Sequence, residues 1–467
     1  MCWHAAPNAF STMAKTKDKT VWFCTACGAD SPKWAGRCPV CGEWNTMVEE
    51  KVKTGGRRAA ASSGRPAARP RAVNDIEAVE EPRIHMPSEE LNRVLGGGLV
   101  RGSIVLIGGE PGIGKSTLVL QNLLAMRKRR ILYVSGEESA TQLKLRADRI
   151  GRGSDSLFIV AETSLENIFE AIESVDPEIV VVDSIQTIAT DELESSAGSV
   201  GQVKECAAAL LRYAKDSGVP VLLIGHINKE GTLAGPKVLE HTVDAVLQFE
   251  GDRQYMFRLL RAIKNRFGST NELGIYEMRQ QGLREVTNPS ELLLGNGDTA
   301  LSGVAVGVTL EGIRPFLIEI QALVSTAAYG TPQRSVTGFD AKRMNMLLAV
   351  LEKRVGFKLG AKDVFLNIAG GLRVSDPALD LGVIAAILSS NVDMNIERGW
   401  CLAGEVGLSG EVRPVIRIEQ RIIEADKLGM TDIVVPKGNL KGFDTSKLNI
   451  RIHEVAKVAD AFRLLFG

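Results

Sequence analysis

The chain has 467 residues, of which 45% are hydrophobic and 24% are charged, a composition ordinary for a folded protein of about two to four domains. Its 56 lysine and arginine residues balance 56 aspartate and glutamate residues, so nucleic-acid binding would have to rely on local basic surfaces. No run approaches the roughly 18 consecutive apolar residues of a membrane span, and the N-terminus lacks the apolar core of a signal peptide, so we expect a cytoplasmic protein without membrane contact.

The first residues of the chain carry no pattern of secondary structure. Residues 1–12 lack any periodicity, whereas Met13-Ala14-Lys15 resembles a more usual start of a protein. Either an upstream start codon or a disordered leader would explain them, and we expect a disordered leader over residues 1–20.

Four cysteines follow in two closely spaced pairs, Cys24 with Cys27 and Cys38 with Cys41. Two matched pairs of thiolates can complete the tetrahedral ligand set of Zn²⁺, and the glycine after each pair permits a tight turn around the ion. A redox-active pair is the alternative, which the matched spacing disfavours. The spacing therefore predicts a zinc finger of the ribbon type at residues 21–48, whose folding depends mainly on the metal.

A basic segment separates this module from the rest of the chain. Residues 51–71 contain seven lysine and arginine residues and no acidic residue, among glycine, alanine, serine and proline. That composition predicts a flexible linker over residues 49–81, whose cations either follow a phosphate backbone or are simply solvated.

The central feature is a phosphate-loop motif that lies between an apolar run typical of a buried strand and a segment with helical spacing of apolar residues. The loop residues and the next helical residue are Gly109, Glu110, Pro111, Gly112, Ile113, Gly114, Lys115, Ser116 and Thr117. Such a loop binds the phosphates of ATP through backbone N–H groups and the helix N-terminus. We expect Lys115 to neutralise the β- and γ-phosphates, Ser116 to bind Mg²⁺ and Thr117 to face the α-phosphate side.

Residues 82–290 alternate short apolar runs with amphipathic segments, as a parallel sheet with crossover helices requires. The predicted strands are residues 131–135, 157–160, 179–183, 219–225 and 245–249. Asp183 ends one of these strands, where a carboxylate can orient Mg²⁺ through water in the manner of a Walker B residue.

Two further strand ends carry groups suited to catalysis. Glu137 and Glu138 follow the strand at 131–135, and we take Glu137 as the base that orients the attacking water, with Glu138 as the alternative. Either glutamate could instead merely begin the next helix. His226 follows the strand at 219–225 and is a candidate sensor of the γ-phosphate, unless it is only a hydrogen-bonded structural residue.

An apolar strand at residues 256–263 leads into Lys264-Asn265-Arg266-Phe267-Gly268. We expect this pentapeptide to form an exposed basic turn at the edge of the sheet. Its two cations are solvated, contact DNA, or stabilise charge on the γ-phosphate bound by a neighbouring subunit.

The order of cysteine pairs, phosphate loop and Lys-Asn-Arg-Phe-Gly pentapeptide closely resembles the RadA (Sms) family of bacterial DNA repair proteins, over nearly the whole chain. The resemblance implies a DNA-dependent ATPase of the RecA type that acts on single-stranded and branched DNA, promotes branch migration, and works with a RecA-type recombinase. It places Glu137 at the catalytic glutamate, and His226 where RecA has a glutamine. It also places a DNA-binding loop at residues 228–237. Fold analogy favours a role for Lys264 and Arg266 at a neighbour's γ-phosphate, in a homo-hexamer.

Residues 363–467 resemble the proteolytic domain of Lon, most clearly at residues 404–410 and 432–436. A Lon site needs a serine and a lysine. Here a lone Ser375 precedes the stretch where the serine belongs, and Arg417 and Arg421 lie near the expected lysine but cannot lose a proton to act as bases. The resemblance therefore implies a Lon-like domain that does not cleave peptides.

The sequence thus predicts an α/β protein with an N-terminal zinc ribbon, a RecA-like P-loop ATPase core, a connecting region at residues 291–362 and a C-terminal Lon-like α+β domain. The last domain would build the ring and contact DNA through cations on a predicted helix, namely Lys342, Arg343, Lys353 and Arg354. An ATP-dependent protease of the Lon type and an ATP-binding scaffold without motor action are the alternatives. The expected cofactors are ATP, Mg²⁺ and Zn²⁺.

Overall fold

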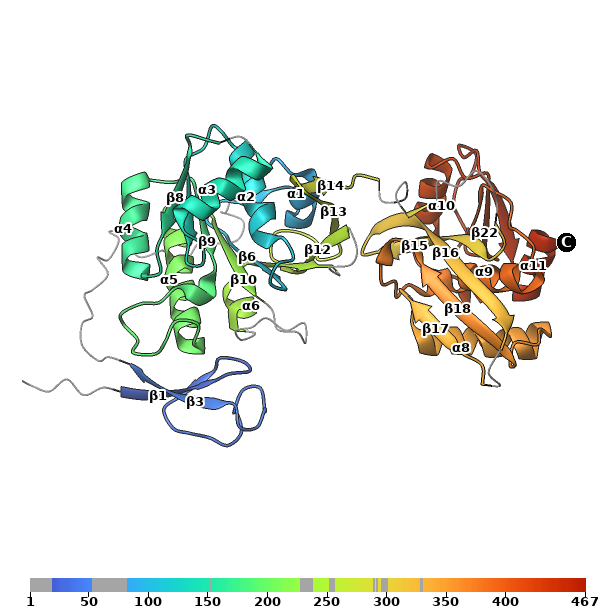
Figure 1. The fold of residues 1–467 in the computed structure, drawn as a ribbon, viewed down its shortest axis with the longest axis horizontal. Helices are drawn as coiled ribbons and strands as arrows, with labels where there is room; N and C mark the ends of the chain where they lie inside the picture. Colours follow the sequence, from blue (N-terminus) through green and yellow to red (C-terminus); the bar gives the residue numbers. More distant parts are fainter. Residues whose placement is uncertain are drawn as a thin grey trace, which may run out of the picture. The chain divides into compact units, whose positions relative to one another are not determined.

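The computed structural model describes residues 19–52, 82–151, 153–226, 238–251, 257–288, 290, 293–294, 301–327 and 331–467. Most of the expected leader and linker, and the DNA loop expected at residues 228–237, lie outside these residues. The chain divides into two compact units, one up to Pro87 with Gly98–Leu247, the other Ser88–Gly97 with Gln248–Gly467. Figure 1 draws the elements of the chain, coloured from the N-terminus to the C-terminus. In the described ranges, every helix is too short or too polar to cross a bilayer.

The first unit begins with a small module of three antiparallel strands in the order β2-β1-β3. These strands are β1 (Lys19–Cys24), β2 (Asp30–Ser31) and β3 (Met47–Val52). β3 pairs with β1 along its whole length, from Cys24 opposite Met47 to Lys19 opposite Val52. The module therefore extends beyond residues 21–48 at both ends, because the pairing of two strands, rather than a change in composition, sets its limits.

The core of the first unit is a parallel sheet with the strand order β6-β10-β9-β7-β8 and with β11 on the other side of β6. The elements in chain order are β4 (Arg83–Ile84), β5 (Leu99–Val100), β6 (Ile104–Gly109), α2 (Lys115–Ala125), β7 (Ile131–Ser135), α3 (Ala140–Ile150), β8 (Leu157–Ala161), α4 (Leu165–Val175), β9 (Ile179–Asp183), η2 (Ile185–Thr187), α5 (Val200–Ser217), β10 (Val221–His226), α6 (Val238–Thr242) and β11 (Ala245–Glu250). The strands predicted from apolar runs are all present, within two residues of their expected bounds.

Both faces of this sheet are covered, which explains why its strands read as continuous apolar runs. Val134 and Val182 belong to a core that includes apolar residues of α4 and α5. Their neighbours Tyr133 and Val181 alternate to the opposite face and are also fully buried. Helix α2 contacts β6, and α3 contacts β8. The first polar residue after such a run therefore marks the point where the strand leaves the core.

The second unit contains α1 (Glu89–Leu95) and three antiparallel strands, β12 (Phe257–Asn265), β13 (Leu273–Arg279) and β14 (Gly282–Glu285). α1 packs against β12 and β13. By their contacts these elements cluster with the C-terminal residues. The strand order β14-β13-β12-β11-β6-β10-β9-β7-β8 nevertheless includes them in one sheet, so an ATPase domain spanning residues 82–290 stays a prediction.

The rest of the second unit is a domain built on a seven-stranded mixed sheet with the order β17-β18-β16-β15-β19-β22-β23. Its elements are β15 (Val304–Glu311), β16 (Arg314–Thr326), β17 (Arg334–Thr337), α8 (Ala341–Val350), η3 (Leu351–Val355), β18 (Lys362–Ile368), η4 (Ala369–Gly371), η5 (Pro377–Leu379), α9 (Asp380–Val392), β19 (Trp400–Leu402), β20 (Glu405–Val406), β21 (Val412–Arg413), α10 (Ile418–Lys427), β22 (Asp432–Pro436), β23 (Arg451–Val455) and α11 (Val458–Phe466). The prediction that residues 291–362 form a connecting region is therefore corrected. This region contains β15, β16 and α8, which belong to this domain because β16 pairs with β18 over seven residue pairs.

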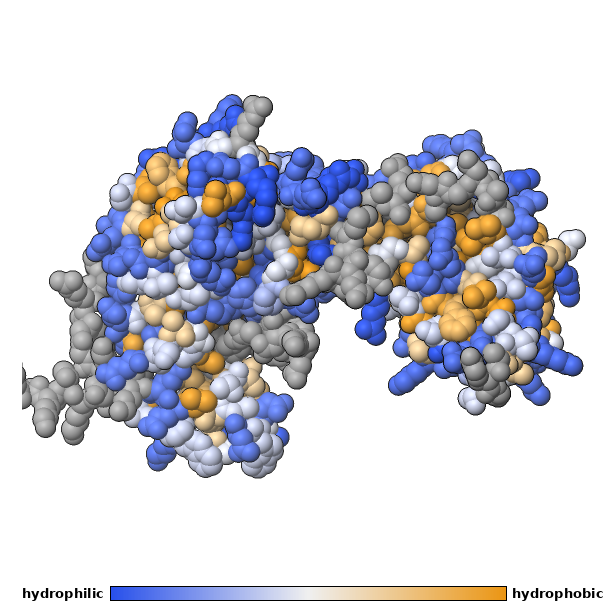
Figure 2. Space-filling model, in the orientation of Figure 1, coloured by the Kyte–Doolittle hydropathy of each residue, from blue (hydrophilic) through white to orange (hydrophobic). Residues whose placement is uncertain are grey.

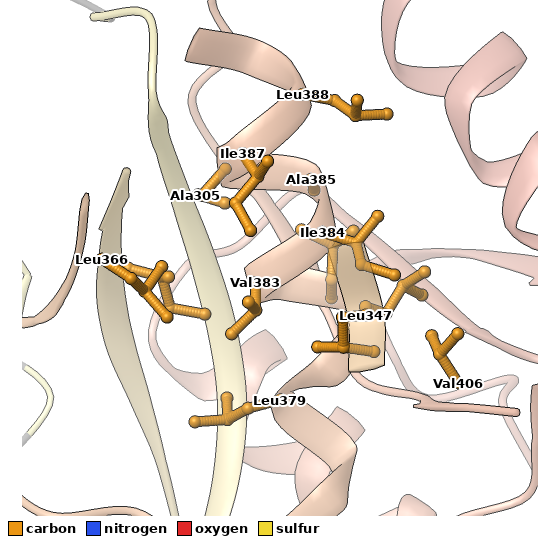
Figure 3. Packing of buried hydrophobic residues seen from close by; sticks show 14 of the residues in the cluster. Ala305, Leu347, Leu366, Leu379, Val383, Ile384, Ala385, Ile387, Leu388 and Val406 are labelled. Carbon is orange, nitrogen blue, oxygen red and sulfur yellow. The ribbon is translucent and has the colours of Figure 1, made fainter. Parts of the chain in front are cut away.

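Helix α9 lies at the centre of the C-terminal domain. It packs on β15 and β16, and Figure 3 shows its Ile384 beside Leu347 of α8 and its Val383 on the side toward Leu366 of β18. A second core on the opposite face contains apolar residues of α10. The sheet is thus covered on both faces, which explains the apolar character of its central strands.

Candidate functional site

Four candidate residues of the first unit lie at one edge of the parallel sheet, where the carboxyl ends of its strands meet. His226 at the end of β10 is opposite Gly109 at the end of β6, and Asp183 at the end of β9 is opposite Ser135 at the end of β7. Glu137 follows Ser135 by two residues. Because ligands of such sheets bind outside the carboxyl ends of the strands, this edge is the expected position of a nucleotide site.

The phosphate loop connects β6 to α2 at this edge. Gly112 and Gly114 have φ angles of 77° and 117°, in the left-handed region that glycine adopts without strain. Gly114 is also the N-cap of α2, and no side chain caps this helix terminus. The backbone N–H groups of the first turn can therefore bind phosphate oxygens, so the loop fits the nucleotide that its sequence predicts.

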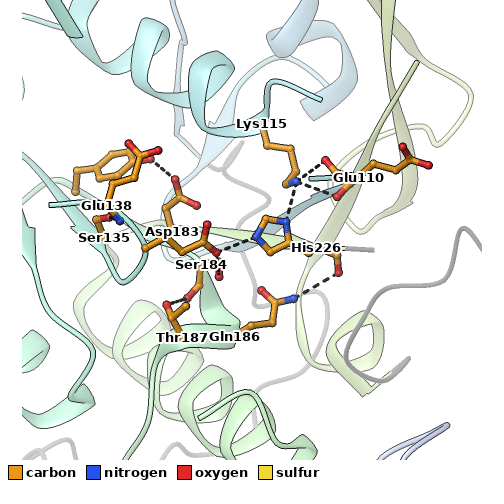
Figure 4. A network of polar contacts seen from close by, with 12 residues as sticks. Glu110, Lys115, Ser135, Glu138, Asp183, Ser184, Gln186, Thr187 and His226 are labelled. Carbon is orange, nitrogen blue, oxygen red and sulfur yellow. Dashed lines mark hydrogen bonds and ion pairs between the residues drawn. The ribbon is translucent and has the colours of Figure 1, made fainter. Parts of the chain in front are cut away.

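Lys115 is buried and turns back toward the loop that carries it. Its Nζ donates to the carbonyl oxygens of Gly109, at 2.8 Å, and Glu110, at 3.0 Å, and lies 3.2 Å from Nδ1 of His226 (Figure 4). Burial lowers the pKa of Lys115 to about 8, and the nearby carboxylates of Asp183 and Glu137 oppose this shift only in part. A bound polyphosphate would place negative charge next to this ammonium group, which in the described structure contacts carbonyl oxygens and an imidazole nitrogen.

His226 connects Lys115 to the candidate base. Its Nε2 lies 2.8 Å from Oε1 of Glu137. Because an ammonium group can only donate, Nδ1 of His226 accepts from Lys115, and the proton of the neutral ring is on Nε2, which donates to Glu137. A change in the position of Lys115 can therefore affect the carboxylate of Glu137 through the imidazole ring of His226.

The two neighbouring glutamates differ in their partners. Glu137 Oε1 also accepts a 2.6 Å hydrogen bond from Ser184 Oγ. Although burial alone would raise the pKa of Glu137, the hydrogen bonds from Ser184 and His226 lower it, so the group is an ionised acceptor at neutral pH. Glu138 instead forms an ion pair with Arg146 of α3. Only Glu137 is thus directed toward Lys115 and His226.

Asp183 has a partner that the sequence pattern did not indicate. The hydroxyl of Tyr133, a fully buried residue of β7, donates to Asp183 Oδ2 at 2.5 Å. Burial, followed by the charge of Asp183, raises the pKa of Tyr133 well above its usual value, so this hydroxyl remains a donor. Tyr133 could have been noticed in the sequence, because it is a hydroxyl-bearing residue inside an apolar strand, two residues before Ser135. Ser184 could have been found from its place next to Asp183.

The four cysteines of the N-terminal module are brought together as predicted. Their sulfur atoms all lie within 4.8 Å of one another, with Cys24 and Cys41 at 3.7 Å and Cys27 and Cys38 at 3.5 Å. A tetrahedral site with Zn–S bonds of about 2.3 Å requires sulfur atoms about 3.8 Å apart. The arrangement therefore fits Zn²⁺, with one thiolate from each cysteine.

The basic pentapeptide lies at the end of β12 in the second unit. The strand includes Lys264 and Asn265, so the turn begins at Arg266, two residues later than predicted. Asn265 Nδ2 donates to the Val94 carbonyl oxygen of α1 at 3.2 Å, and Asn265 Oδ1 accepts from the Phe267 N–H at 2.9 Å. Lys264 is half-buried and Arg266 is exposed. Asn265 therefore orients the segment that carries the two cations.

Residues considered for a Lon-type site or a DNA surface have other surroundings. Arg421 is fully buried and pairs with Asp376 at 2.7 Å, while Ser375 is exposed. Arg343, predicted to face DNA, instead forms an ion pair with the buried Asp380 at the start of α9. The sequence pattern could not reveal this, because the carboxylate is 37 residues further along the chain.

The remaining predicted surface cations are exposed. Lys342 lies on α8, and Lys353 and Arg354 lie on the π-helical segment η3 that continues it. Several large apolar side chains of this domain are also exposed, among them Leu323, Leu408 and Ile416, and Figure 2 shows apolar areas on the face it draws. Such areas are typical of protein interaction surfaces.

Three domain families match parts of the chain. They are the rubredoxin metal binding domain at residues 22–49, the AAA domain at residues 69–232 and subunit ChlI of Mg-chelatase at residues 320–439. Together with the structure, these matches confirm the expected fold: a zinc ribbon, a P-loop ATPase core of the RecA type and a C-terminal α+β domain.

Proteins similar along almost the whole chain are also known. The DNA repair protein RadA of Bacillus subtilis (strain 168) is 51% identical over 460 residues, which are 97% of this chain and 100% of the relative. The protein of the same name from Halalkalibacterium halodurans is 50% identical over 455 residues, with 97% and 99% coverage. Among solved structures, a KaiC-like protein from Pyrococcus horikoshii OT3 is 20% identical, with a TM-score of 0.38, and covers 44% of this chain and 100% of its own.

Proposed function

This chain belongs to the RadA family of bacterial DNA repair proteins, and we propose that it is a DNA-dependent ATPase that drives branch migration of recombination intermediates. The observation that carries the hydrolytic part of this proposal is the chain of contacts from Lys115 through His226 to Glu137 at the carboxyl edge of the sheet. The family supports the DNA part, in which single-stranded and branched DNA are the substrates and a RecA-type recombinase is the partner.

Each residue of the site has a role that follows from its contacts. Lys115 neutralises the β- and γ-phosphates, and the loop from Gly109 to Thr117 binds them through backbone N–H groups. Ser116 and Asp183 would bind Mg²⁺, directly and through water, with Asp183 oriented by the Tyr133 hydroxyl. When bound, Mg²⁺ neutralises charge on the β- and γ-phosphates.

Glu137 acts as the base that orients the attacking water. The hydrogen bonds from Ser184 and His226 both reach Oε1 and fix the orientation of the carboxylate. The other oxygen, Oε2, can accept a proton from water. His226 contacts both Lys115 and Glu137, which supports its role in sensing the γ-phosphate. Movement of Lys115 toward a phosphate would change the hydrogen bonding of His226 and so the position of the base.

Lys264 and Arg266 act on the nucleotide of a neighbouring subunit. Their place at the end of a strand, on a segment oriented by Asn265, supports a role that needs fixed geometry. The exposed apolar side chains of the C-terminal domain support a ring, for which we propose a hexamer, and the exposed Lys342, Lys353 and Arg354 support DNA contact.

Mixed rings test the role of Lys264. We expect Lys264→Ala to bind nucleotide and single-stranded DNA but to lose DNA-stimulated hydrolysis, as Lys115→Ala loses hydrolysis altogether. Mixing the two inactive variants should restore part of the ATPase activity, since some interfaces then combine an intact loop with an intact Lys264. Absence of recovery, with subunit exchange verified by labelled protomers, would contradict the trans role and favour direct DNA contact.

The rival function is proteolysis, which the C-terminal likeness to Lon suggests. We propose that the domain does not cleave peptides, because Arg417 and Arg421 cannot lose a proton to act as bases, and Arg421 is buried against Asp376. ATP hydrolysis with and without single-stranded DNA, measured beside casein cleavage, separates the two functions. ATP-dependent casein cleavage that is lost in Ser375→Ala would overturn the motor assignment in favour of a protease.

A further inference from the structure

A four-residue turn of the C-terminal domain contacts the hairpin that carries Lys264 and Arg266. This turn, residues 311–314, joins β15 to β16 and lies in the same compact unit as α1 and β12–β14. We infer that it is a brace that positions the Lys-Asn-Arg-Phe-Gly segment, so that hydrolysis depends on the C-terminal domain. The inference rests on the proposed role of Lys264, and it adds the residues that hold that side chain in place.

The first contact is with the loop of the hairpin. The Ile313 N–H donates to the Asn271 carbonyl oxygen at 2.9 Å. Gly312 has a φ of 64°, and a Cβ at this position would lie 1.8 Å from the same oxygen. Only glycine allows this approach, so the turn and the loop between β12 and β13 are in direct backbone contact.

The second contact is with β12, the strand that leads to Lys264. Glu311 Oε2 lies 2.9 Å from Nη1 of Arg261, which is three residues before Lys264. Arg261 also contacts Glu250 at 3.2 Å. The Glu311 side chain is 13% exposed, and a pair so well shielded from water restricts the strand more than a surface ion pair would.

The third contact is with α1. Arg314 Nη1 lies 2.7 Å from Oε2 of Glu90, a side chain that is 1% exposed. The same oxygen accepts a 3.0 Å hydrogen bond from the Ile275 N–H of β13. Since Val94 of α1 accepts from Asn265 in the pentapeptide, Arg314 acts on the helix that holds Asn265.

Four consecutive residues thus restrain the hairpin at three places: the strand before Lys264, the loop after Arg266, and the helix that anchors Asn265. A cation that stabilises charge on a distant phosphate must be held closely, because a displacement of about 1 Å can lower turnover roughly 100-fold. Residues 311–314 are therefore positioning residues for Lys264, and a movement of the C-terminal domain would move the hairpin with it.

Gly312→Ala in the full-length protein tests this brace. Gly438→Ala is the matched control, because Gly438 has a φ of 78° in the same domain but no atom within 4 Å of a new Cβ. We expect Gly312→Ala, and not the control, to speed hydrogen exchange of residues 264–272 and to lower the kcat of DNA-stimulated hydrolysis about tenfold or more, with the KM for ATP unchanged. A purely structural defect would instead lower the amount of folded protein and leave the kcat per folded ring unchanged.

The milder variant Glu311→Gln removes only the charge that pairs with Arg261 and provides a second test if Gly312→Ala does not fold. Unchanged exchange of residues 264–272, or an unchanged kcat, in the folded variants would overturn the inference. Lys264→Ala, assayed in parallel, separates the two hypotheses. If Lys264→Ala loses stimulation while Gly312→Ala keeps it, the brace alone is refuted; if Lys264→Ala keeps stimulation, the proposed role of Lys264 fails.

Discussion

The phosphate site of the first unit and the C-terminal domain both bring cations close to carboxylates, with opposite results. In the described structure, Lys115 donates to two backbone carbonyls and contacts His226, and burial depresses its pKa. Arg421, by contrast, is fully buried with its charge matched by Asp376. Removing one partner of a buried ion pair is costly to the fold, whereas a cation that burial leaves without a matching charge is suited to a charged ligand.

The zinc ribbon is the extreme case of a site built for a ligand, so loss of one ligand should have the largest effect. Cys27→Ser leaves three thiolates and removes most of a binding energy on the order of 10 kcal/mol that folds so small a module. We expect less than one zinc per chain and fast hydrogen exchange over residues 19–52, with the ATPase core intact. About one tightly bound zinc in the purified variant would contradict the assignment of four cysteine ligands.

Substitution of each of the two adjacent glutamates, Glu137 and Glu138, tests which of them acts on the nucleotide. Glu137→Gln removes the proposed base and should lower the turnover of ATP by about 10²–10⁴-fold, while nucleotide affinity is retained. Glu138→Gln is the control, because Glu138 pairs with Arg146, and it should change turnover by only a few-fold. Steady-state hydrolysis with saturating DNA measures both, and a reversed order would make Glu138 the base.

Loss of a matched cation in the C-terminal domain should act on stability rather than on chemistry. Arg421→Met leaves the Asp376 carboxylate without its buried partner and should lower the free energy of unfolding by about 3–5 kcal/mol. Arg417→Met, at an exposed position four residues earlier, should change it little. Urea unfolding of both variants gives the answer, and equal stabilities would show that the Arg421–Asp376 pair contributes nothing.

The unmatched charge of Lys115 should be visible as proton uptake. Its pKa in the free protein is lowered to about 8 by burial, and bound phosphates would raise it again. Near pH 8, ATP binding should therefore take up roughly half a proton, and the uptake should vanish well below pH 7, where Lys115 is already charged. Calorimetry in buffers of different ionisation enthalpy measures this uptake. If the same uptake persists in Lys115→Met, another group is responsible.

Local patterns were sufficient to predict the parts of the molecule that depend on a few consecutive residues. The phosphate loop needs glycines, a lysine and a serine at fixed spacing, and each cysteine pair provides two metal ligands within four residues. The parallel strands were predictable because strands covered on both faces are apolar without interruption, so Asp183 and His226 stand out where the runs end.

Contacts between residues far apart in the chain were decided only by the tertiary structure. Tyr133 reaches Asp183 across 50 residues, Arg343 reaches Asp380 across 37, and Arg314 reaches Glu90 across 224. Whether a charge is matched inside the fold depends on these distances, and so does the boundary of the C-terminal domain, which strand pairing moves to residue 304. Hydrogen bonds and ion pairs act through space over a few ångströms, and only the folded chain determines which side chains come that close.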